Sequence, residues 1–245
     1  MKGTQYFVVT GCSKGIGKAL VELLLSDPTN KVLGISRSEV TFNNPCFAHI
    51  RMDLTASGLK PEILMKIFPD DPFDSYVLIN NAGTIGDIAH FGHLSNKGIQ
   101  DVLELNATVP AILMNAFVER YASTPNAKKA VVNISSGAAN KTIDGWAMYS
   151  ASKSAINAIS LTAQEESKLS GNGIRFFALA PGVVDTDMQE SIRGASEASF
   201  SQLGRFKDLK DNQKLSKPSE VAEKIIYLLD HLEEFPEVVQ DVRSF

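Results

Sequence analysis

The stretch Tyr6-Phe7-Val8-Val9-Thr10-Gly11-Cys12-Ser13-Lys14-Gly15-Ile16-Gly17 decides the fold. It begins as a short apolar run typical of a buried strand, passes through a glycine-bearing turn, and continues with apolar residues at helical spacing. Those helical positions are Ile16, Ala19, Leu20, Leu23 and Leu24. A strand, a tight turn and a helix in this order predict a βαβ unit of a parallel sheet that is buried on both faces.

The same alternation of strands and helices continues along the chain. We predict seven strands, at Tyr6–Thr10, Lys31–Ser36, Phe47–Met52, Tyr76–Asn80, Ala130–Ser135, Ile174–Ala180 and, more weakly, Val238–Val242. Further helices are predicted at Pro61–Phe68, Ile99–Tyr121, Met148–Ser170 and Ser219–His231. Because parallel crossovers are right-handed, helices should cover both faces of one sheet. The predicted fold class is α/β: a doubly wound, Rossmann-type parallel sheet of about seven strands.

No linker, repeat or low-complexity tract divides the chain, so we expect one domain over residues 1–245. Residues 187–217 follow the sixth strand and carry little strand signal. In open α/β sheets, ligands bind at the carboxyl ends of the strands. We therefore predict that residues 187–217 form an insertion over a ligand crevice.

Composition limits the classes of partner. The 245 residues include 24 Lys plus Arg and 28 Asp plus Glu, a net charge of -4, and 44% are hydrophobic. This profile is typical of a globular protein. Its net negative charge gives no electrostatic reason to bind the phosphate backbone of a nucleic acid. The apolar stretch at Asn106–Val118 contains Pro110 and is too short to span a membrane, and the N-terminus lacks a signal-peptide pattern. We expect a cytoplasmic protein without a metal site, since Cys12 and Cys46 show no ligand spacing.

The turn from Gly11 to Gly17 is suited to binding phosphate. Gly11 permits a tight turn, Gly15 lets the backbone approach a pyrophosphate, and Gly17 lets the helix lie close to the strand. The helix that follows directs backbone N–H groups and its positive end at the ligand. Ser13 and Ile16 complete this predicted cofactor-binding turn, although a purely structural turn would show the same glycines.

The end of the second strand predicts NADP rather than NAD. An acidic residue usually stands there to bind the adenosine ribose, but this chain has Ser36 and Arg37. A guanidinium offers a 2'-phosphate bidentate hydrogen bonds, and Lys14 in the turn would add a second positive charge. The alternative is that Arg37 and Lys14 are ordinary surface charges.

Tyr149 and Lys153 are four residues apart, so in a helix they face the same side. Lowering the pKa of a phenol from near 10 to about 7 requires roughly 4 kcal/mol of preferential phenolate stabilisation, part of which an ammonium one turn along could supply. Ser136 leaves the fifth strand and would reach the same crevice. Taken alone, such a pair also fits a plain helix surface.

In combination, these motifs resemble the short-chain dehydrogenase/reductase family, in its NADP-preferring form, over nearly the whole chain. Within that family the chain is similar to the branch of sepiapterin reductases and benzil reductases. The motifs that carry the resemblance are Thr10-Gly11-x-x-x-Gly15-x-Gly17, Asp53-Leu54, Asn80-Asn81-Ala82-Gly83, Asn106, Ile134-Ser135-Ser136, Tyr149-x-x-x-Lys153 and Pro181-Gly182-Val183-Val184-Asp185-Thr186.

The resemblance implies a role for each catalytic residue. Tyr149 would act as general acid toward a carbonyl oxygen that Ser136 holds. Lys153 would lower the pKa of the tyrosine and bind the nicotinamide ribose, while Asn106 would hold a water that links the lysine to solvent. The residues implied at the cofactor are Asp53 and Leu54 at the adenine, Asn80, Ala82 and Gly83 at the sheet centre and adenosine ribose, and Pro181, Gly182, Val184 and Thr186 at the carboxamide end.

The implied activity is NADPH-dependent reduction of a ketone, with a vicinal dicarbonyl as the expected small-molecule substrate. Trp146 and Met188 are candidate pocket walls, although core packing would explain both, and Asp241 matches the aspartate that anchors the pterin in sepiapterin reductases. The alternatives are an NADP-dependent secondary alcohol dehydrogenase and a non-catalytic NADP sensor. The family's dimer surfaces, here Ile99–Tyr121 and Met148–Ser170, imply a homodimer or homotetramer.

Overall fold

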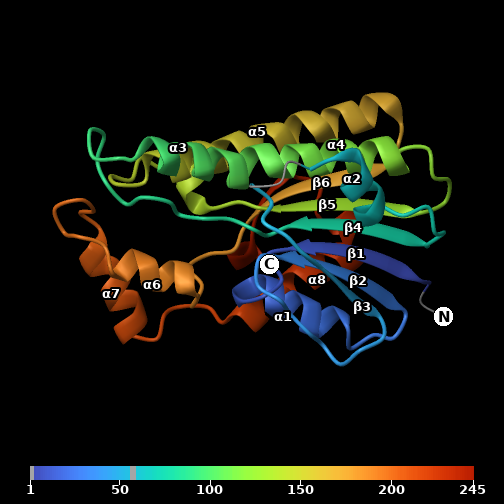
Figure 1. Ribbon diagram of the computed structural model, residues 1–245, viewed down its shortest axis with the longest axis horizontal. Helices are drawn as coiled ribbons and strands as arrows, with labels where there is room; N and C mark the ends of the chain where they lie inside the picture. The colour runs from blue at the N-terminus through green and yellow to red at the C-terminus, as the bar shows by residue number, and fades with distance from the viewer. Residues whose placement is uncertain (1–2, 56–58) are drawn as a thin grey trace.

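The computed structural model describes residues 3–55 and 59–245, and within them seven strands form one parallel sheet in the order β3-β2-β1-β4-β5-β6-β7 (Figure 1). The strands are β1 (Gln5–Thr10), β2 (Asn30–Ser36), β3 (Phe47–Arg51), β4 (Ser75–Asn80), β5 (Lys128–Ile134), β6 (Ile174–Ala180) and β7 (Val239–Asp241). In the centre, Val8 of β1 pairs with Leu33 of β2 on one side and with Leu78 of β4 on the other. The predicted fold class is confirmed.

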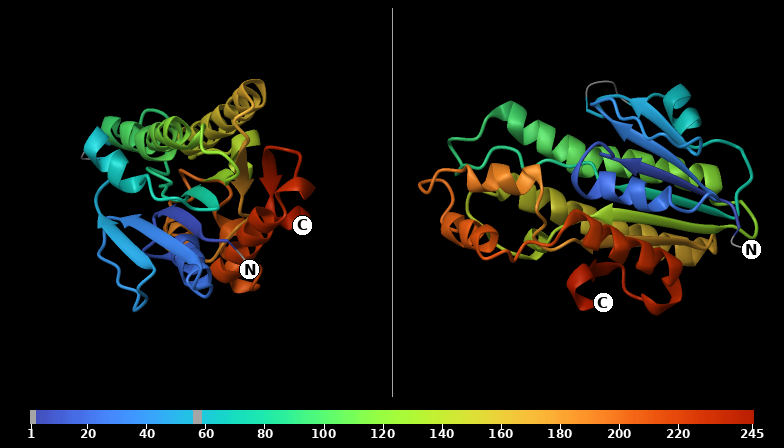
Figure 2. Two further views of the ribbon diagram at one scale, coloured as in Figure 1. Left: turned by 90° about the vertical axis from the view of Figure 1, so that its right-hand side faces the viewer. Right: turned by 90° about the horizontal axis from the view of Figure 1, so that it is seen from below.

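Helices cover both faces of the sheet. They are α1 (Gly15–Leu24), α2 (Pro61–Ile67), α3 (Asn96–Leu103), α4 (Val109–Tyr121), α5 (Ala147–Ser170), α6 (Asp187–Arg193), α7 (Leu203–Asp211) and α8 (Pro218–Asp230), with short turns η1 (Glu104–Thr108), η2 (Gly137–Asn140), η3 (Leu232–Glu234) and η4 (Val242–Ser244). Helices α3, α4 and α5 lie over one face, and α1 and α8 lie over the other (Figures 1 and 2).

Each face of the sheet has its own hydrophobic core. Successive side chains of a strand point to opposite faces, so Phe7 and Val9 of β1 join the core beneath α1 and α8, whereas Val8 joins the core beneath α4 and α5. All three side chains are buried. The continuous apolar run that opens the chain is therefore explained by burial on both faces.

The predicted helix at Ile99–Tyr121 begins earlier, at Asn96, because the Ser95 hydroxyl accepts a hydrogen bond from the Gly98 N–H at 2.9 Å and caps the first turn. The helix from Asn96 to Tyr121 has the length and apolar content of a membrane-spanning helix, but half of its most apolar window is buried. Leu113 and Phe117 pack in the core of the sheet, so core packing accounts for its composition.

The predicted insertion at 187–217 contains α6 and α7, which lie beyond the carboxyl ends of the strands and opposite α3 (Figure 1). A third apolar cluster, separate from the two cores of the sheet, lies beneath it and includes Trp146, Phe200 and Phe206. A parallel bridge between Val184, just before the segment, and Ser216, near its end, closes the segment at its base. The segment is thus a folded cover with an apolar underside.

Candidate active site

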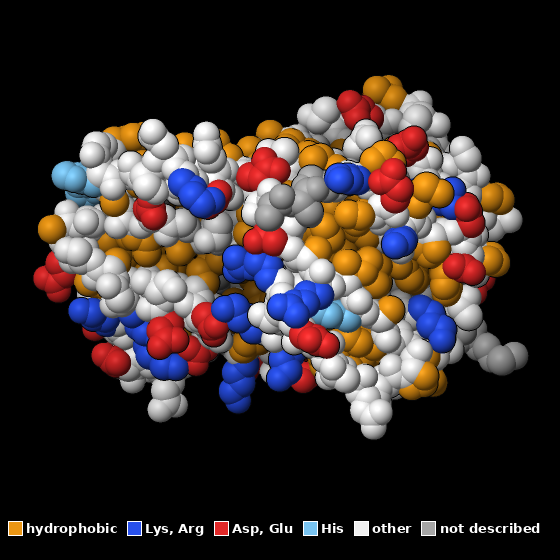
Figure 3. Space-filling model, viewed as in Figure 1, with side chains coloured by type: hydrophobic (Ala, Val, Ile, Leu, Met, Phe, Trp, Pro, Cys, Tyr) orange, Lys and Arg blue, Asp and Glu red, His pale blue; other side chains and the backbone are white. Residues whose placement is uncertain are grey.

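A cavity of about 830 Å³ runs along the carboxyl edge of the sheet, between the strand ends and the cover formed by α6 and α7. Figure 3 shows the face with this hollow: hydrophobic side chains lie inside it, and Lys and Arg side chains gather beside it. The predicted residues that line the cavity are Gly11, Ser13, Lys14, Gly15, Ile16, Ser36, Arg37, Asp53, Leu54, Ala82, Gly83, Ser136, Trp146, Tyr149, Lys153, Pro181, Gly182, Val184, Thr186 and Met188.

The glycine turn forms one wall of the cavity with bare backbone. Gly11 and Gly15 have φ angles of 69° and 55°, in the left-handed region that favours glycine. A Cβ on Gly17 would overlap the carbonyl oxygen of Gly11, so α1 can lie this close to the turn only without a side chain there. Gly17 itself does not line the cavity, and its place in the structure is the predicted packing position. The turn therefore fits the pyrophosphate of a dinucleotide.

Hydrogen bonds of Asn81 and Thr10 join this turn to the end of β4, the neighbouring strand in the sheet. The Asn81 amide donates to the carbonyls of Thr10 and Gly11 at 2.9 and 3.2 Å. In return, the Thr10 hydroxyl accepts hydrogen bonds from the N–H groups of Asn81 and Ala82, both at 3.0 Å. The predicted cofactor residue Asn80 lies deeper: it is buried, donates to Asn133 at 2.8 Å, and does not line the cavity. Asn81 stands at the cavity instead.

Arg37 lies at the end of β2, where sequence analysis predicts a 2'-phosphate. Within residues 3–55 and 59–245, its guanidinium has no ion-pair or hydrogen-bond partner, whereas the neighbouring Ser36 hydroxyl donates to the Ser38 carbonyl at 2.8 Å. Asp53, on the adjacent loop, accepts two hydrogen bonds from Thr55. This leaves the Arg37 guanidinium available to a ligand at the adenosine end of the cavity.

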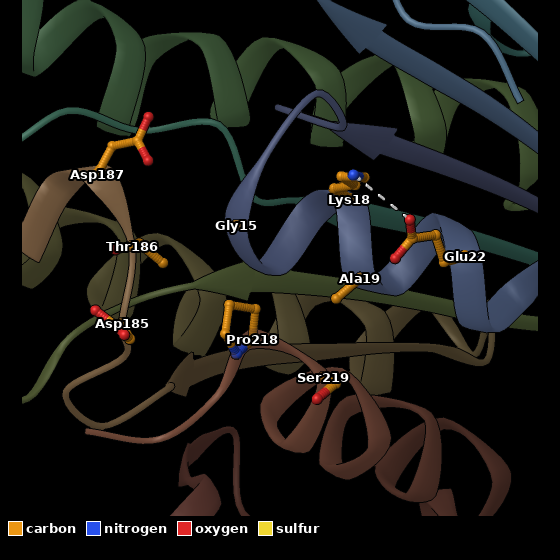
Figure 4. Close-up of a pocket in the computed structure, with 9 residues that line it drawn as sticks. All are labelled: Gly15, Lys18, Ala19, Glu22, Asp185, Thr186, Asp187, Pro218 and Ser219. Atoms are coloured by element: carbon orange, nitrogen blue, oxygen red, sulfur yellow. Dashed lines mark ion pairs between the residues drawn. The ribbon is translucent and has the colours of Figure 1, made fainter. Parts of the chain in front are cut away.

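Lys14 forms an ion pair within the protein, in contrast to Arg37. Its ammonium pairs with Asp187 of α6 at 2.6 Å and so joins the glycine turn to the cover. Both side chains are about two-thirds exposed (66% and 64%), so the pair contributes little stability. Behind it lies a second, open hollow of about 320 Å³ between α1, the start of α8 and residues 185–187 (Figure 4). This hollow holds none of the catalytic candidates, and we assign no site to it.

Tyr149, Lys153 and Ser136 meet at the middle of the cavity. Tyr149 and Lys153 are buried on the first two turns of α5, with the Lys153 ammonium 5.8 Å from the centre of the Tyr149 ring. The ammonium donates to the Ile134 carbonyl at 2.7 Å. The Ser136 hydroxyl accepts a hydrogen bond from the Ala138 N–H at 3.1 Å, which leaves its own proton to donate toward the Tyr149 oxygen or a ligand. The predicted catalytic group is therefore assembled.

Burial governs the protonation of this group. Desolvation raises the pKa of the Tyr149 phenol, and a hydrogen bond with Ser136 acts in the opposite direction. Desolvation also lowers the pKa of Lys153 to about 8. The spacing of Tyr149 and Lys153 predicts that the ammonium lowers the pKa of the phenol. In the structure the pKa of Tyr149 is raised instead, because the loss of water outweighs the other contributions. At neutral pH the phenol carries its proton, as a general acid must.

Asn106 lies behind the lysine rather than on the cavity. It occupies η1, a π-helical turn between α3 and α4, and its amide donates to the Thr84 carbonyl at 2.8 Å and to the Ser152 hydroxyl at 3.0 Å. A Cβ on Gly83 would lie 3.2 Å from Asn106 Oδ1 and 3.6 Å from Lys153 Nζ. Gly83 therefore allows these two side chains to approach the same point of the backbone.

The part of the cavity where Trp146 and Met188 are predicted to contact substrate is apolar on the side of the cover. Trp146 stacks on Phe200 with ring centres 5.2 Å apart, contacts Phe206 at 5.3 Å, and meets the Tyr149 ring edge-on at 5.6 Å. Met188 packs against the same cluster. The two interpretations of Trp146, a pocket wall and a core residue, both hold, since Trp146 is buried in an apolar cluster and also lines the cavity.

The C-terminal segment brings a residue that sequence analysis missed. Asp241 accepts three hydrogen bonds from Arg243, one from its backbone N–H and two from its guanidinium. Arg243, rather than Asp241, lines the cavity. In the sequence, the only sign that Arg243 could line the cavity in place of Asp241 is that the two residues are two positions apart.

Comparison with known proteins places the chain in a family. The family model described as short chain dehydrogenase matches residues 5–197, so the chain belongs to the short-chain dehydrogenases and is an oxidoreductase of that family. The chain is 33% identical over 232 residues to a benzil reductase ((S)-benzoin forming) of Bacillus subtilis, with 92% of this chain and 93% of the relative covered.

Two further relatives agree with this assignment. A sepiapterin reductase of Xenopus tropicalis is 28% identical over 246 residues, covering 93% of this chain and 92% of its own length. Among solved structures, a short-chain dehydrogenase/reductase of Saccharomyces cerevisiae superimposes with a TM-score of 0.81 at 28% identity, covering 97% of this chain and 96% of that chain. The resemblance of the motifs to the short-chain family, and to its branch of benzil reductases and sepiapterin reductases, is confirmed.

Proposed function

We propose that this protein is an NADPH-dependent carbonyl reductase that transfers hydride to the ketone of a vicinal dicarbonyl. The observation that carries the proposal is the convergence of Tyr149, Ser136 and Lys153 on a cavity whose other end is the glycine turn. Benzil reductases and sepiapterin reductases, to which the chain is similar along most of its length, support a dicarbonyl substrate.

The residues at the cavity fit NADPH from end to end. Arg37 would bind the 2'-phosphate, the backbone of the turn would bind the pyrophosphate, and Val184 and Thr186 would hold the carboxamide. When bound there, NADPH supplies the hydride. Lys153 uses one N–H for the Ile134 carbonyl, which leaves two N–H groups for the nicotinamide ribose.

The chain's own residues supply the proton and hold the substrate. The Ser136 hydroxyl donates a hydrogen bond to the carbonyl oxygen, and the Tyr149 phenol donates its proton to the same oxygen as negative charge develops there. Lys153, with a pKa of about 8, then lies close enough to neutral pH to return a proton toward the phenol. Trp146 and Phe206 exclude water from one side of the reacting group.

We also propose a homo-oligomer formed through α4 and α5. Ile112 on α4 and Leu161 and Leu169 on α5 are exposed, at 36%, 50% and 81%. Large apolar side chains exposed on neighbouring helices are typical of interaction surfaces. Light scattering of the purified protein tests this, and a monomer would contradict it.

The activity is tested with the purified protein, NADPH, and a panel of benzil, 1-phenyl-1,2-propanedione and sepiapterin. Expected are oxidation of NADPH and formation of one alcohol per NADPH consumed. Each assay is repeated with NADH, for which a much lower kcat/KM is expected. Tight binding of NADPH without reduction of any member of the panel would contradict the proposal and favour the sensor.

A further inference from the structure

The cavity is positively charged although the protein is not. The chain carries a net charge of -4, yet the cavity is lined by seven Lys or Arg residues and only three Asp residues. Two of the three acids are used in one-to-one ion pairs, Lys97 with Asp101 at 2.7 Å and Lys14 with Asp187 at 2.6 Å. The excess positive charge therefore belongs to the other cations.

Part of this excess lies at the wall made by the C-terminal segment. The Arg243 guanidinium binds both oxygens of Asp241, through Nε at 2.8 Å and through Nη2 at 2.5 Å. A guanidinium has five N–H groups, so three remain for another partner. The Arg243 side chain is 64% exposed and lines the cavity. Asp241 thus orients the guanidinium without using all its donors.

A second cation that lines the cavity acts on the same carboxylate through its charge. Lys141 also lines the cavity, and its charge contributes, after that of Arg243, to lowering the pKa of Asp241. Within residues 3–55 and 59–245, Lys141 forms no ion pair of its own. Arg243 and Lys141 carry two positive charges against the one negative charge of Asp241, which leaves one positive charge in excess, unlike the neutral pair of Lys97 and Asp101.

Both cations are attached to the segments that hold the reacting group. Lys141 directly follows η2, the turn that starts after Ser136. The Arg243 side chain packs against Gly182, with its Cδ 3.6 Å from where a Cβ would stand. An anionic group bound by Arg243 and Lys141 would therefore lie beside Gly182 and beside the segment that carries Ser136.

We propose that the substrate carries a carboxylate besides the reacting ketone, and that Arg243, oriented by Asp241 and assisted by Lys141, binds this carboxylate. The proposal names the substrate class of the proposed reductase and so rests on that function. The ketone takes a hydride from NADPH and a proton from Tyr149 and becomes a hydroxyl group, while the carboxylate is unchanged. A planar guanidinium matches the two oxygens of a carboxylate, which favours an oxo acid as the substrate.

The test compares acids with their neutral methyl esters. Benzoylformate places the carboxylate next to the ketone, and 4-oxo-4-phenylbutanoate places it farther away. With NADPH in excess, at least one acid should have a kcat/KM about tenfold or more above that of its ester, as charge-assisted hydrogen bonds provide. Arg243→Gln should bring that ratio close to one, mainly through KM of the acid, and Lys141→Gln should lower it less.

Lys97→Gln is the matched control. Lys97 lines the same cavity but is neutralised by Asp101, so this variant should keep the acid-to-ester ratio of the wild type. Asp241→Asn retains both cations but releases the guanidinium, and it should lower the ratio even though it removes a negative charge. Thermal unfolding of each variant verifies that the fold is intact.

Calorimetric titration of benzoylformate and 4-oxo-4-phenylbutanoate into the protein with NADP⁺ bound gives a readout without turnover. Binding of either acid that Arg243→Gln weakens about tenfold supports the proposal, whereas absence of binding or equal binding to both proteins overturns it. Equal kcat/KM for acids and esters also overturns it. If benzil is reduced and the acids are not preferred, only the carboxylate proposal fails; if no carbonyl is reduced, the proposed reductase fails and the titration still decides the carboxylate site.

Discussion

The two ends of the cavity are built in different ways. At the cofactor end, the glycine turn offers backbone N–H groups, and the whole turn comes from consecutive residues Gly11–Gly17. At the end proposed to bind the substrate, side chains make the walls, and they come from segments far apart in sequence: Trp146 from the start of α5, Phe206 from α7 and, by the proposal above, Arg243 from the C-terminus. A site made of backbone can therefore be predicted from local sequence, while a site made of side chains depends on which segments meet in the folded chain.

Removing the Tyr149 hydroxyl should have the largest effect on activity. It should lower kcat without weakening NADPH binding, and so distinguish the two ends of the cavity. Tyr149→Phe loses the proton donor, and we expect kcat to fall about 10³-fold. The dissociation constant of NADPH should change by less than about twofold, because the turn is untouched. Steady-state kinetics and a fluorescence titration with NADPH measure the two quantities.

Tyr227→Phe is the control, since the Tyr227 hydroxyl bonds Glu234 on the outside of α8. A Tyr149→Phe enzyme with more than a tenth of the wild-type kcat would show that another group supplies the proton.

Arg37→Ala should weaken the cofactor end selectively. Loss of a bidentate, charge-assisted contact should raise the dissociation constant of NADPH by about 10- to 100-fold and leave that of NADH nearly unchanged. Lys18→Ala on α1, a lysine that already pairs with Glu22, is the control and should affect neither. Equal weakening of both cofactors would mean that Arg37 does not contact a 2'-phosphate.

Lys153→Met should increase stability while removing activity. The pKa of Lys153 falls from 10.5 to about 8 on folding, so the buried charge destabilises the folded state at pH 7. Replacement by an uncharged chain of similar length should raise the free energy of unfolding by about 2 kcal/mol at pH 7, after the lost hydrogen bond to Ile134 is subtracted.

The pH dependence gives the sign of this effect. Between pH 8 and 10.5 the unfolded chain still holds the Lys153 proton that the folded protein has released, so Lys153 makes wild-type stability rise with pH across that window. The variant lacks this contribution, and its advantage should shrink from pH 7 to pH 10 in urea unfolding. A variant less stable than the wild type at pH 7 would contradict the interpretation.

The smallest effect is expected in the cover. Gly204 lies in α7, and a Cβ there would meet no atom within 4 Å. Gly204→Ala should therefore stabilise the protein by about 0.5 to 1 kcal/mol, because alanine favours a helix. Thermal unfolding measures the gain. A loss of stability would mean that α7 needs the freedom of glycine, as the turn at Gly11–Gly17 does.

Most strands and helices, and the placement of Tyr149 and Lys153 on one side of α5, could be predicted because each depends on a local pattern. The π-helical turn at Asn106 could not, since it arises where Asn106 bonds Thr84 and Ser152 from two other segments. The early end of β7, one residue before the predicted Val242, also results from a side-chain contact. The Asp241 carboxylate accepts the Arg243 N–H and turns the chain into η4, so the strand ends at Asp241 instead of Val242.

The sequence by itself determined the parallel sheet, the glycine turn, and the spacing that puts Tyr149 and Lys153 on one side of a helix. These features depend on residues close together along the chain, where the periods of strands and helices apply. The tertiary structure alone decided that burial raises the pKa of Tyr149 and that Arg243, instead of Asp241, lines the cavity. Loss of water and contacts between distant segments exist only once the chain is folded.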